Sequence, residues 1–393
     1  MKSTDYFSPD YATARERFLA AARHRGAQHE SHILAAHGPA GEPLTMDAAR
    51  LGDPAAEHAV IISSGLHGIE GFLGSALQAA WLDNHGGTRV LPAGVSLVLV
   101  HALNPFGFAW QRRTNENNVD LNRNFLDEFG FRETDPTYRE SRMAYDRFCP
   151  LLNPQSPPSR WEPYRPFVAL YILREGYATR RRLRARGQPV PLPWAWPAIW
   201  RLGLRELQKT LPVGQYEHPA GLFYGGREPE ETVRSVRAQL PHWVANARRV
   251  IHVDLHTGLG QYADYRLYTS ETQGSEQQRW LAQCFGAQAV AVWDPQIDNY
   301  PARGLMSVDL RSRLRACRYH GLTAEFGTYA GVRVVGALRA ENRAHCHSLP
   351  GSPPYRWAKS QLMEAFCPTD AKWREAAIRN GLAVIDRALA AFG

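Results

Sequence analysis

The sequence predicts an α/β protein in which helices cover a sheet. Short apolar segments rich in β-branched residues, typical of buried strands, recur along the chain, and segments with helical periodicity separate them. Polar segments with histidine, asparagine and arginine follow the strands predicted at 59–62 and 95–101. Because ligands of such sheets bind at the carboxyl ends of the strands, we expect the functional site there.

Each predicted element has a local cause in the sequence. Residues 11–25 form an amphipathic pattern, residues 72–82 are apolar and rich in alanine, and the glycines and prolines of 38–43 favour a turn. Strands are predicted at 32–36, 59–62, 95–101, 250–255, 266–269, 289–293 and 322–326. Helices are predicted at 11–25, 72–82, 231–246, 276–285, 307–319 and 373–391.

Length and composition are those of a globular protein. The 393 residues suffice for one large or two ordinary domains, and 44% are hydrophobic and 21% charged. No apolar run reaches the roughly 18–20 residues of a membrane span, and the N-terminal residues lack the apolar region of a signal peptide. The five cysteines are scattered and form no Cys-x-x-Cys pair, so we expect a reduced, cytoplasmic protein.

The formal net charge of +8 comes largely from arginines in residues 174–186, which include Arg180-Arg181-Arg182. Such a run binds nucleic acid or acidic lipid in some proteins, but more often it is the solvated face of a helix. The sequence contains no zinc-finger, RNA-recognition or helix-turn-helix signature. We therefore expect neither nucleic acid nor a membrane as a partner.

The most informative stretch is Ser63-Ser64-Gly65-Leu66-His67-Gly68-Ile69-Glu70-Gly71, between a predicted strand and a predicted helix. Residues three apart on a helical turn face the same way, so an imidazole and a carboxylate at this spacing can hold one metal ion. The three glycines keep the backbone free of side chains around that point. The same spacing also arises by chance at the start of a surface helix, so the motif alone does not decide.

A second polar stretch follows the strand at 95–101. It contains Arg112, Arg113 and, further on, Asn122 and Arg123. The planar fork of arginine matches a carboxylate or an oxyanion, so the stretch indicates anion recognition. A loop rich in asparagine with solvated arginines explains the same residues equally well.

Together these residues resemble a known family. His67-x-x-Glu70, Asn104-Pro105-x-Gly107-Phe108 and Asp120-x-Asn122-Arg123-Asn124-Phe125 are similar to motifs of the zinc carboxypeptidases, typified by carboxypeptidase A. In their exact residues, these motifs look most like an uncharacterised bacterial branch of the DUF2817 type. The resemblance covers about 59–336 and implies one α/β domain with a mixed, largely parallel sheet sandwiched by helices.

The resemblance requires a second histidine and a later glutamate, and the sequence contains both. His256 ends the strand that begins near 250, and it matches the third zinc ligand; Glu325 lies in the apolar strand at 322–326 and matches the general base. His252 lies on the same strand face as His256, and we expect it to be a hydrogen-bonded core histidine. Asp254 either supports the site through a hydrogen bond or orients a turn.

The resemblance also implies the roles of the remaining residues. One Zn²⁺ per chain would bind through His67, Glu70 and His256, with a fourth position open for water. Arg112 or Arg113 would stabilise the oxyanion, and the sequence leaves open which of them. Asn122 and Arg123 are similar to the pair that holds the terminal carboxylate of a substrate. Tyr300 matches a mobile tyrosine loop, although an ordinary surface tyrosine explains it equally well.

These roles imply a zinc-dependent hydrolase that cleaves an amide bond next to a free carboxylate, as a metallocarboxypeptidase does with a small peptide. One alternative is a deacylase of N-acyl amino acids, similar to aspartoacylase. Another is a zinc-binding protein without catalytic activity, but such a protein would be expected to lose the base, and Glu325 is present.

The segment 126–249 departs from the classical carboxypeptidases because it is much longer. It contains the arginine-rich helix, proline-rich stretches at 153–158 and 188–197, and the tryptophans Trp194, Trp196 and Trp200. It is either a helical elaboration at the edge of the sheet or a lid that limits access to small substrates, and we favour the lid.

Overall fold

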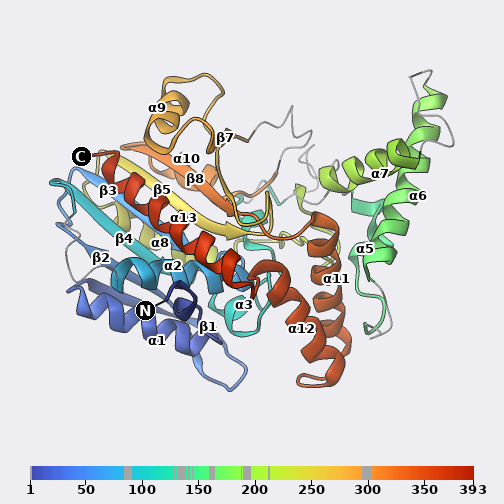
Figure 1. Ribbon diagram of the computed structural model, residues 1–393, viewed down its shortest axis with the longest axis horizontal. Helices are drawn as coiled ribbons and strands as arrows, with labels where there is room; N and C mark the ends of the chain where they lie inside the picture. Colours follow the sequence, from blue (N-terminus) through green and yellow to red (C-terminus); the bar gives the residue numbers. More distant parts are fainter. Residues whose placement is uncertain are drawn as a thin grey trace.

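The structure is a computed structural model of the chain, in which helices cover both faces of a twisted sheet and a pair of helices projects at one end (Figure 1). It describes residues 2–83, 91–127, 130–131, 139, 142–143, 145–158, 164–186, 188, 196–210, 213–293 and 302–393.

The described residues contain an eight-stranded sheet with the strand order β1-β2-β4-β3-β5-β8-β6-β7. The four central strands β4, β3, β5 and β8 are mutually parallel. Strand β2 pairs antiparallel with β1 and β4, β6 pairs antiparallel with β8, and β7 is parallel to β6. The predicted α/β class with a mixed, largely parallel sheet is therefore confirmed. The strands are β1 (Gln28–His37), β2 (Pro43–Leu51), β3 (His58–Ser64), β4 (Val95–His101), β5 (Arg249–Thr257), β6 (Tyr265–Thr269), β7 (Val290–Val292) and β8 (Arg318–Phe326).

Besides the α-helices, the described residues contain three short 3-10 turns. The turns are η1 (Ser3–Tyr6), η2 (Gly68–Glu70) and η4 (Leu121–Arg123). The helices are α1 (Tyr11–His24), α2 (Gly71–Asp83), α3 (Pro105–Ala109), α5 (Cys149–Leu152), α6 (Tyr164–Ala185), α7 (Trp196–Thr210), α8 (Glu231–Val244), α9 (Glu276–Phe285), α10 (Met306–Arg313), α11 (Gly331–His347), α12 (Pro353–Phe366) and α13 (Ala371–Ala390).

The central strands are continuously apolar because helices cover both faces of the sheet, as strand β3 illustrates. Val60 and Ile62 belong to the core formed with α1, α2 and α13, whereas Ala59 and Ile61 belong to the core formed with α8 and α10 on the other face. Successive side chains of a strand point to opposite faces, and here both faces are covered. All four side chains are fully buried.

Strand β2 was not predicted, because its sequence lacks a clear apolar pattern. Its polar residues Thr45 and Asp47 are buried all the same, and Asp47 accepts hydrogen bonds from Arg15 on α1 and Ser31 on β1. Hydrogen bonds to residues distant in the sequence therefore offset the free-energy cost of burying these polar groups. The helices α11 and α12 were not predicted either.

The helix predicted at 307–319 is wrong at its end. Helix α10 ends at Arg313, and strand β8 begins at Arg318. Arg318 pairs with Arg249 at the start of β5, so pairing across the sheet outweighs local helix propensity there.

The segment 126–249 contributes to two parts of the molecule. Helix α8 packs on the sheet through Val233, Val236 and Leu240, so this helix belongs to the core. Helices α6 and α7 pack on each other and project from the end near α11 (Figure 1). They cross closely, because a Cβ atom on Gly203 of α7 would lie 1.6 Å from the carbonyl oxygen of Ile172 on α6.

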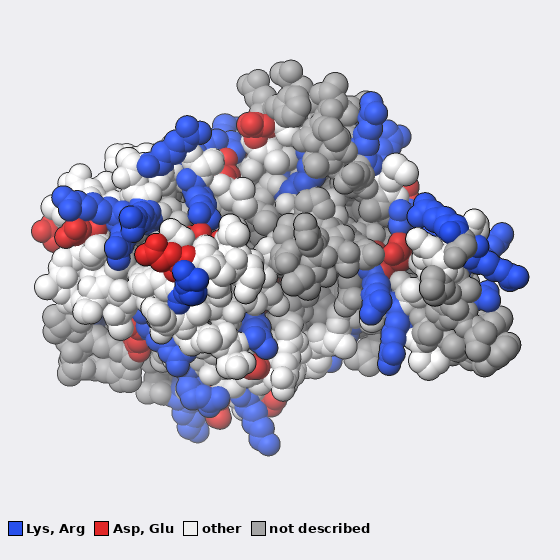
Figure 2. Space-filling model, turned by 90° about the horizontal axis from the view of Figure 1, so that it is seen from above, with Lys and Arg blue, Asp and Glu red and all other residues white. Residues whose placement is uncertain are grey.

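The surface of the projecting helices is basic. Figure 2 shows blue side chains gathered at the end of the molecule where α6 and α7 lie. Arg174, Arg181 and Arg184 are exposed on α6, as expected for a solvated helix face. Among the described residues, no helix has both the length and the apolar character needed to cross a membrane.

Candidate metal centre

The sheet topology brings three predicted site residues to one edge. Strands β3, β5 and β8 are adjacent and parallel, so their carboxyl ends lie side by side. Glu70 follows β3 on η2, and His256 and Glu325 lie near the ends of β5 and β8. His256 and Glu325 are register partners, so their side chains leave the same face of the sheet.

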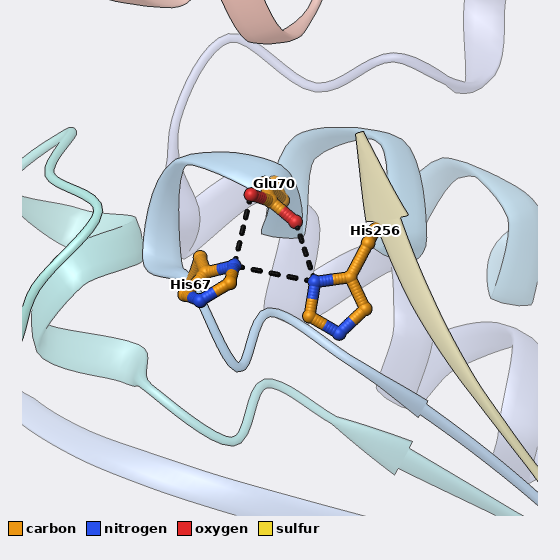
Figure 3. Close-up of side chains that lie close together, drawn as sticks. All are labelled: His67, Glu70 and His256. Carbon is orange, nitrogen blue, oxygen red and sulfur yellow. Dashed lines mark hydrogen bonds and ion pairs between the residues drawn. The ribbon is translucent and has the colours of Figure 1, made fainter. Parts of the chain in front are cut away.

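His67, Glu70 and His256 form a buried cluster with the geometry of a metal site (Figure 3). His67 Nδ1 lies 2.9 Å from Glu70 Oε1, and His256 Nδ1 lies 2.9 Å from Glu70 Oε2. The two Nδ1 atoms are 3.2 Å apart, and one ligand atom from each residue falls within 4.8 Å of the others. These three side chains converge on one point from two neighbouring strand ends.

A carboxylate holds the other nitrogen of each histidine. His67 Nε2 lies 3.1 Å from Asp120 Oδ1, and His256 Nε2 lies 2.5 Å from Asp254 Oδ2. At His256 the carboxylate of Asp254 keeps the proton on Nε2 and leaves the Nδ1 lone pair for a metal ion, whereas Nε2 of His67 also lies 2.8 Å from Arg113 Nη2. Asp254 also accepts a hydrogen bond from Ser63, so it has the supporting position that was one of its two predicted roles.

Sequence reasoning did not assign a role to Asp120. The residue stands in the motif Asp120-x-Asn122-Arg123, where its carboxylate also accepts a hydrogen bond from the backbone of Asn122 at the start of η4. Only the fold shows that the same carboxylate also reaches His67.

The charges at the site are held in their ionised forms by one another. Burial alone would raise the pKa of Glu70, but the imidazoles of His67 and His256 hold it below its ordinary value. Burial likewise opposes ionisation of Asp120, and Arg113 and His67 keep its pKa well below the usual range. Two imidazoles whose Nδ1 atoms lie beside a buried carboxylate are a donor set that suits Zn²⁺, so the residues present fit this ion.

Glu325 differs from the other carboxylates of the site. Burial is the main reason that its pKa rises to about 8, and the neighbouring Glu70 adds to the shift. Part of the side chain faces a cavity, but its Oε2 is shielded from solvent and has no hydrogen-bond partner among the described residues. A carboxyl group with a raised pKa beside a metal site is suited to taking up and releasing a proton near neutral pH.

The structure separates the two adjacent arginines. Arg113 lines the cavity, and its guanidinium contacts Asp120 at 3.0 Å and Glu70 at 3.3 Å. Arg112 points away into a buried cluster, where Nε lies 2.9 Å from Glu341 Oε1 and Nη2 contacts Asn342. The geometry therefore favours Arg113 for contact with a substrate, and the prediction that included Arg112 does not fit its position.

Arg112 has a different relation to the site, through its backbone. The carbonyl oxygens of Arg112 and Arg113 accept hydrogen bonds from the backbone N–H groups of Ile69 and Gly68 on η2. Gly68 lies so close to α3 that a Cβ atom would come within 2.0 Å of the Gly107 backbone. The turn that carries Glu70 is thus held from two sides.

Asn122 and Arg123 line the same cavity as the metal cluster. Asn122 Oδ1 accepts a hydrogen bond from the backbone of Met306 at the start of α10, and Arg123 Nη1 donates to the carbonyl oxygen of Asn122. Ser307 also lines the cavity. Tyr300 lies outside the described residues.

His252 is a core histidine. Its Nε2 lies 2.7 Å from Ser63 Oγ, and its Nδ1 lies 2.7 Å from the hydroxyl of Tyr319. Burial lowers its pKa to about 4, so the ring is neutral at physiological pH. Both of its nitrogens contact hydroxyl groups, and that His252 is no metal ligand stays a prediction.

The cluster opens into a cavity of about 1040 Å³. Beyond the residues already placed there, side chains of α7, α10 and α11 form parts of its wall. The cavity is therefore large enough for a ligand much larger than a water molecule.

A family model described as "Protein of unknown function (DUF2817)" matches residues 7–190 and 196–380. The chain belongs to the DUF2817 family. The match spans most of the sequence and confirms the predicted resemblance to this branch. A comparison with curated proteins finds no match.

Three solved structures illustrate what this DUF2817 chain is similar to. Bovine thrombin-activatable fibrinolysis inhibitor is 10% identical, with 98% of this chain and 97% of that chain covered at a TM-score of 0.49. A metallo-carboxypeptidase from Burkholderia cenocepacia is 13% identical, with 96% of this chain and 69% of that chain covered at a TM-score of 0.44. Murein-tripeptide amidase MpaA from Escherichia coli O157 is 18% identical, with 84% of this chain and 96% of that chain covered at a TM-score of 0.37. We base the function on the residues of the site themselves.

Proposed function

We propose that this chain is a zinc-dependent hydrolase that cleaves an amide bond next to a free carboxylate. The main support is the buried cluster of His67, Glu70 and His256, with Glu325 beside it on the neighbouring strand. Two histidines and one carboxylate with an open position are a ligand set of catalytic zinc. When bound, zinc would lower the pKa of a water molecule and polarise the substrate carbonyl.

The proton would move through Glu325. Its carboxylate would accept the proton of the attacking water and pass it to the leaving amine. Burial raises the pKa of this carboxyl group, so it holds a proton readily once the attacking water has given it up. Arg113 would lie beside the carbonyl oxygen and stabilise the negative charge that develops on it.

Asn122 and Arg123 would hold the free carboxylate of the substrate. Both line the cavity that contains the metal cluster, and the fork of a guanidinium matches a carboxylate through two parallel hydrogen bonds. The same residues would serve a peptide and an N-acyl amino acid, since both carry a free carboxylate next to the scissile amide.

The substrate carboxylate is the feature to test. Purified protein is analysed for zinc and then assayed for amine release from short peptides and N-acyl amino acids, each as the free acid and as the C-terminal amide. A charge-assisted contact to arginine is worth roughly 1.5–3 kcal/mol, or about 10- to 150-fold, so the amides should be cleaved at least about tenfold less efficiently in kcat/KM.

Arg123→Ala should lower activity on the free acid and leave the amide nearly unchanged, so that the two rates become similar. Arg123→Lys is the matched variant that keeps the charge without the fork. If the wild type cleaves acid and amide equally well, these residues do not recognise a carboxylate. If zinc-loaded protein cleaves none of these amides, the proposed function is wrong.

A further inference from the structure

One wall of the cavity is apolar and comes from elements far apart in the sequence. On α7, the apolar cavity-lining residues recur four and three positions apart, which places them on one face of the helix. Further apolar lining residues belong to α11 and to the loop that contains the buried Phe223. The side chains used below are Trp200, Leu204 and Leu207 of α7, Val335 and Leu338 of α11, and Phe223 of the loop.

The wall borders the Arg113 side of the metal centre. The guanidinium carbon of Arg113 lies 5.7 Å from the ring centre of Phe223, and Leu338 lines a small void together with both residues. Asn122 instead borders the start of α10 through its contact with Met306. A substrate whose carboxylate is held by Asn122, and whose carbonyl lies beside Arg113, would therefore extend its acyl group along the apolar wall.

The charges of the cavity argue against a free ammonium group on that side. Among the described lining residues, the carboxylates are Glu70, Asp254 and Glu325, and all three lie at the metal centre. Arg205 is the charged residue that α7 adds to the lining, and it would repel an ammonium group. A tripeptide with a free N-terminus would place its ammonium group along that wall without an acidic partner, whereas an acyl chain brings no charge.

We propose that the substrates are N-acyl amino acids with an apolar acyl chain of several carbons, which lies against α7 and α11. This inference rests on the proposed function and narrows it to the deacylase. In the reaction, the hydroxyl of water joins the acyl carbon as the C–N bond breaks, and the proton of the water goes to the leaving nitrogen. The products are a fatty acid and a free amino acid.

The test is a series of acyl chain lengths. The N-acetyl, N-butyryl, N-hexanoyl and N-octanoyl derivatives of the amino acid that is released fastest are assayed with the zinc-loaded protein. Each methylene buried against the wall should raise kcat/KM by about two- to fourfold until the wall is filled. A tripeptide that presents two leucines with a free N-terminus on the acyl side of the same amino acid should be cleaved more slowly than the N-octanoyl compound.

A pair of variants on α7 tests whether the dependence of activity on acyl chain length comes from this wall. Leu204→Gln should lower the ratio of N-octanoyl to N-acetyl activity at least about fivefold, because the acyl chain would lie against an amide. Leu202→Gln is the matched control: Leu202 is half-buried on the same helix but does not line the cavity, so the ratio should stay unchanged. Circular dichroism melting identifies variants that fail to fold, and Trp200→Ala then replaces Leu204→Gln.

Binding gives a second readout that does not depend on turnover. N-octanoyl and N-acetyl amino acid are titrated into zinc-loaded Glu325→Gln protein by calorimetry, and tighter binding of the octanoyl compound supports the wall. Equal binding and equal rates along the series, or faster cleavage of the tripeptide, would overturn this inference while leaving amide hydrolysis intact. Absence of cleavage of every amide with zinc bound would instead overturn the proposed function.

Discussion

His256 of the candidate metal centre has different partners at its two nitrogens. In His256, Nδ1 faces Glu70 and His67, and Nε2 contacts Asp254. In His252, four residues earlier on the same strand, hydroxyl groups contact both nitrogens instead. The hydrogen-bond partners thus differ between the proposed ligand and the core residue even though the two rings leave the same strand face.

This distinction predicts different effects of two substitutions on metal binding. His256→Ala should lose most of the bound zinc, because it removes one of three ligands. His252→Ala should keep the zinc and lose only stability, since it removes buried hydrogen bonds to Ser63 and Tyr319. The measurement is the zinc content per chain by mass spectrometry after dialysis, and equal metal loss in the two variants would refute the ligand assignment.

Glu325 is predicted to act on protons and not on the metal. Glu325→Gln should keep the zinc content and the melting temperature close to those of wild type, because the amide has nearly the same shape. It should reduce kcat by roughly 10²- to 10⁴-fold, the usual contribution of a general acid–base group. Steady-state kinetics on any cleaved substrate check this, and activity within a fewfold of wild type would exclude the role.

Among the elements, the short turn η2 has the largest influence on the site. The backbone of Arg112 and Arg113 holds η2, and the Arg112 side chain is itself held in the cluster with Glu341. Lys359 Nζ lies 2.6 Å from the same Glu341 oxygen. Burial lowers the pKa of Lys359 to about 8 despite this contact, so one carboxylate balances two cations away from water.

Removing the carboxylate of this cluster should lower the stability of the fold more than removing its ammonium group. Glu341→Gln should destabilise the fold by roughly 3–5 kcal/mol, because it leaves buried cations without an anion. Lys359→Met should cost much less, since Arg112 and Glu341 remain as a pair. Urea unfolding of both variants measures the difference, and a comparable loss in the two would show that the charge balance is unimportant. A Glu341→Gln protein that still folds should also bind zinc more weakly, because η2 carries Glu70.

At the scale of the whole molecule, two helical layers bury the sheet and with it several ionisable groups. His101 on β4 is one of them: its Nε2 lies 2.9 Å from Ser75 Oγ on α2, and its ring stacks on Phe18 of α1 at 4.7 Å. Burial lowers the pKa of His101 from 6.5 to about 4, so the folded protein keeps this ring neutral in mild acid.

This burial predicts a loss of stability in acid. Between pH 6.5 and 4 the unfolded chain binds a proton at His101 and the folded chain does not, so the free energy of unfolding should fall by up to about 1.4 kcal/mol per pH unit from this group. Urea midpoints measured across this range check it. His101→Gln should be less stable at pH 7 but show a shallower decline, and a decline parallel to wild type would contradict the prediction.

Much of the fold was predictable because its central strands have local signals. The segments around 59–62, 95–101, 250–255 and 322–326 are apolar enough to be recognised one by one, and all are strands in the structure. Strand β2 was missed because its buried Asp47 is compensated by Arg15 and Ser31, which are distant in the sequence. Local patterns show burial only where the buried side chains are themselves apolar.

The sequence by itself determined the residue types of the site and the strand ends at which they stand. His67 and Glu70 share one turn, and His256 and Glu325 each lie near the end of an apolar strand, but the resemblance to the zinc carboxypeptidases was needed to single them out. Only the tertiary structure decided which arginine enters the cavity, that Asp120 reaches His67, and that α7 forms part of the cavity wall. The physical reason is that these contacts join segments through the strand order β4-β3-β5-β8, in which β5 and β8 lie far from β3 in the chain, and no local periodicity contains that order.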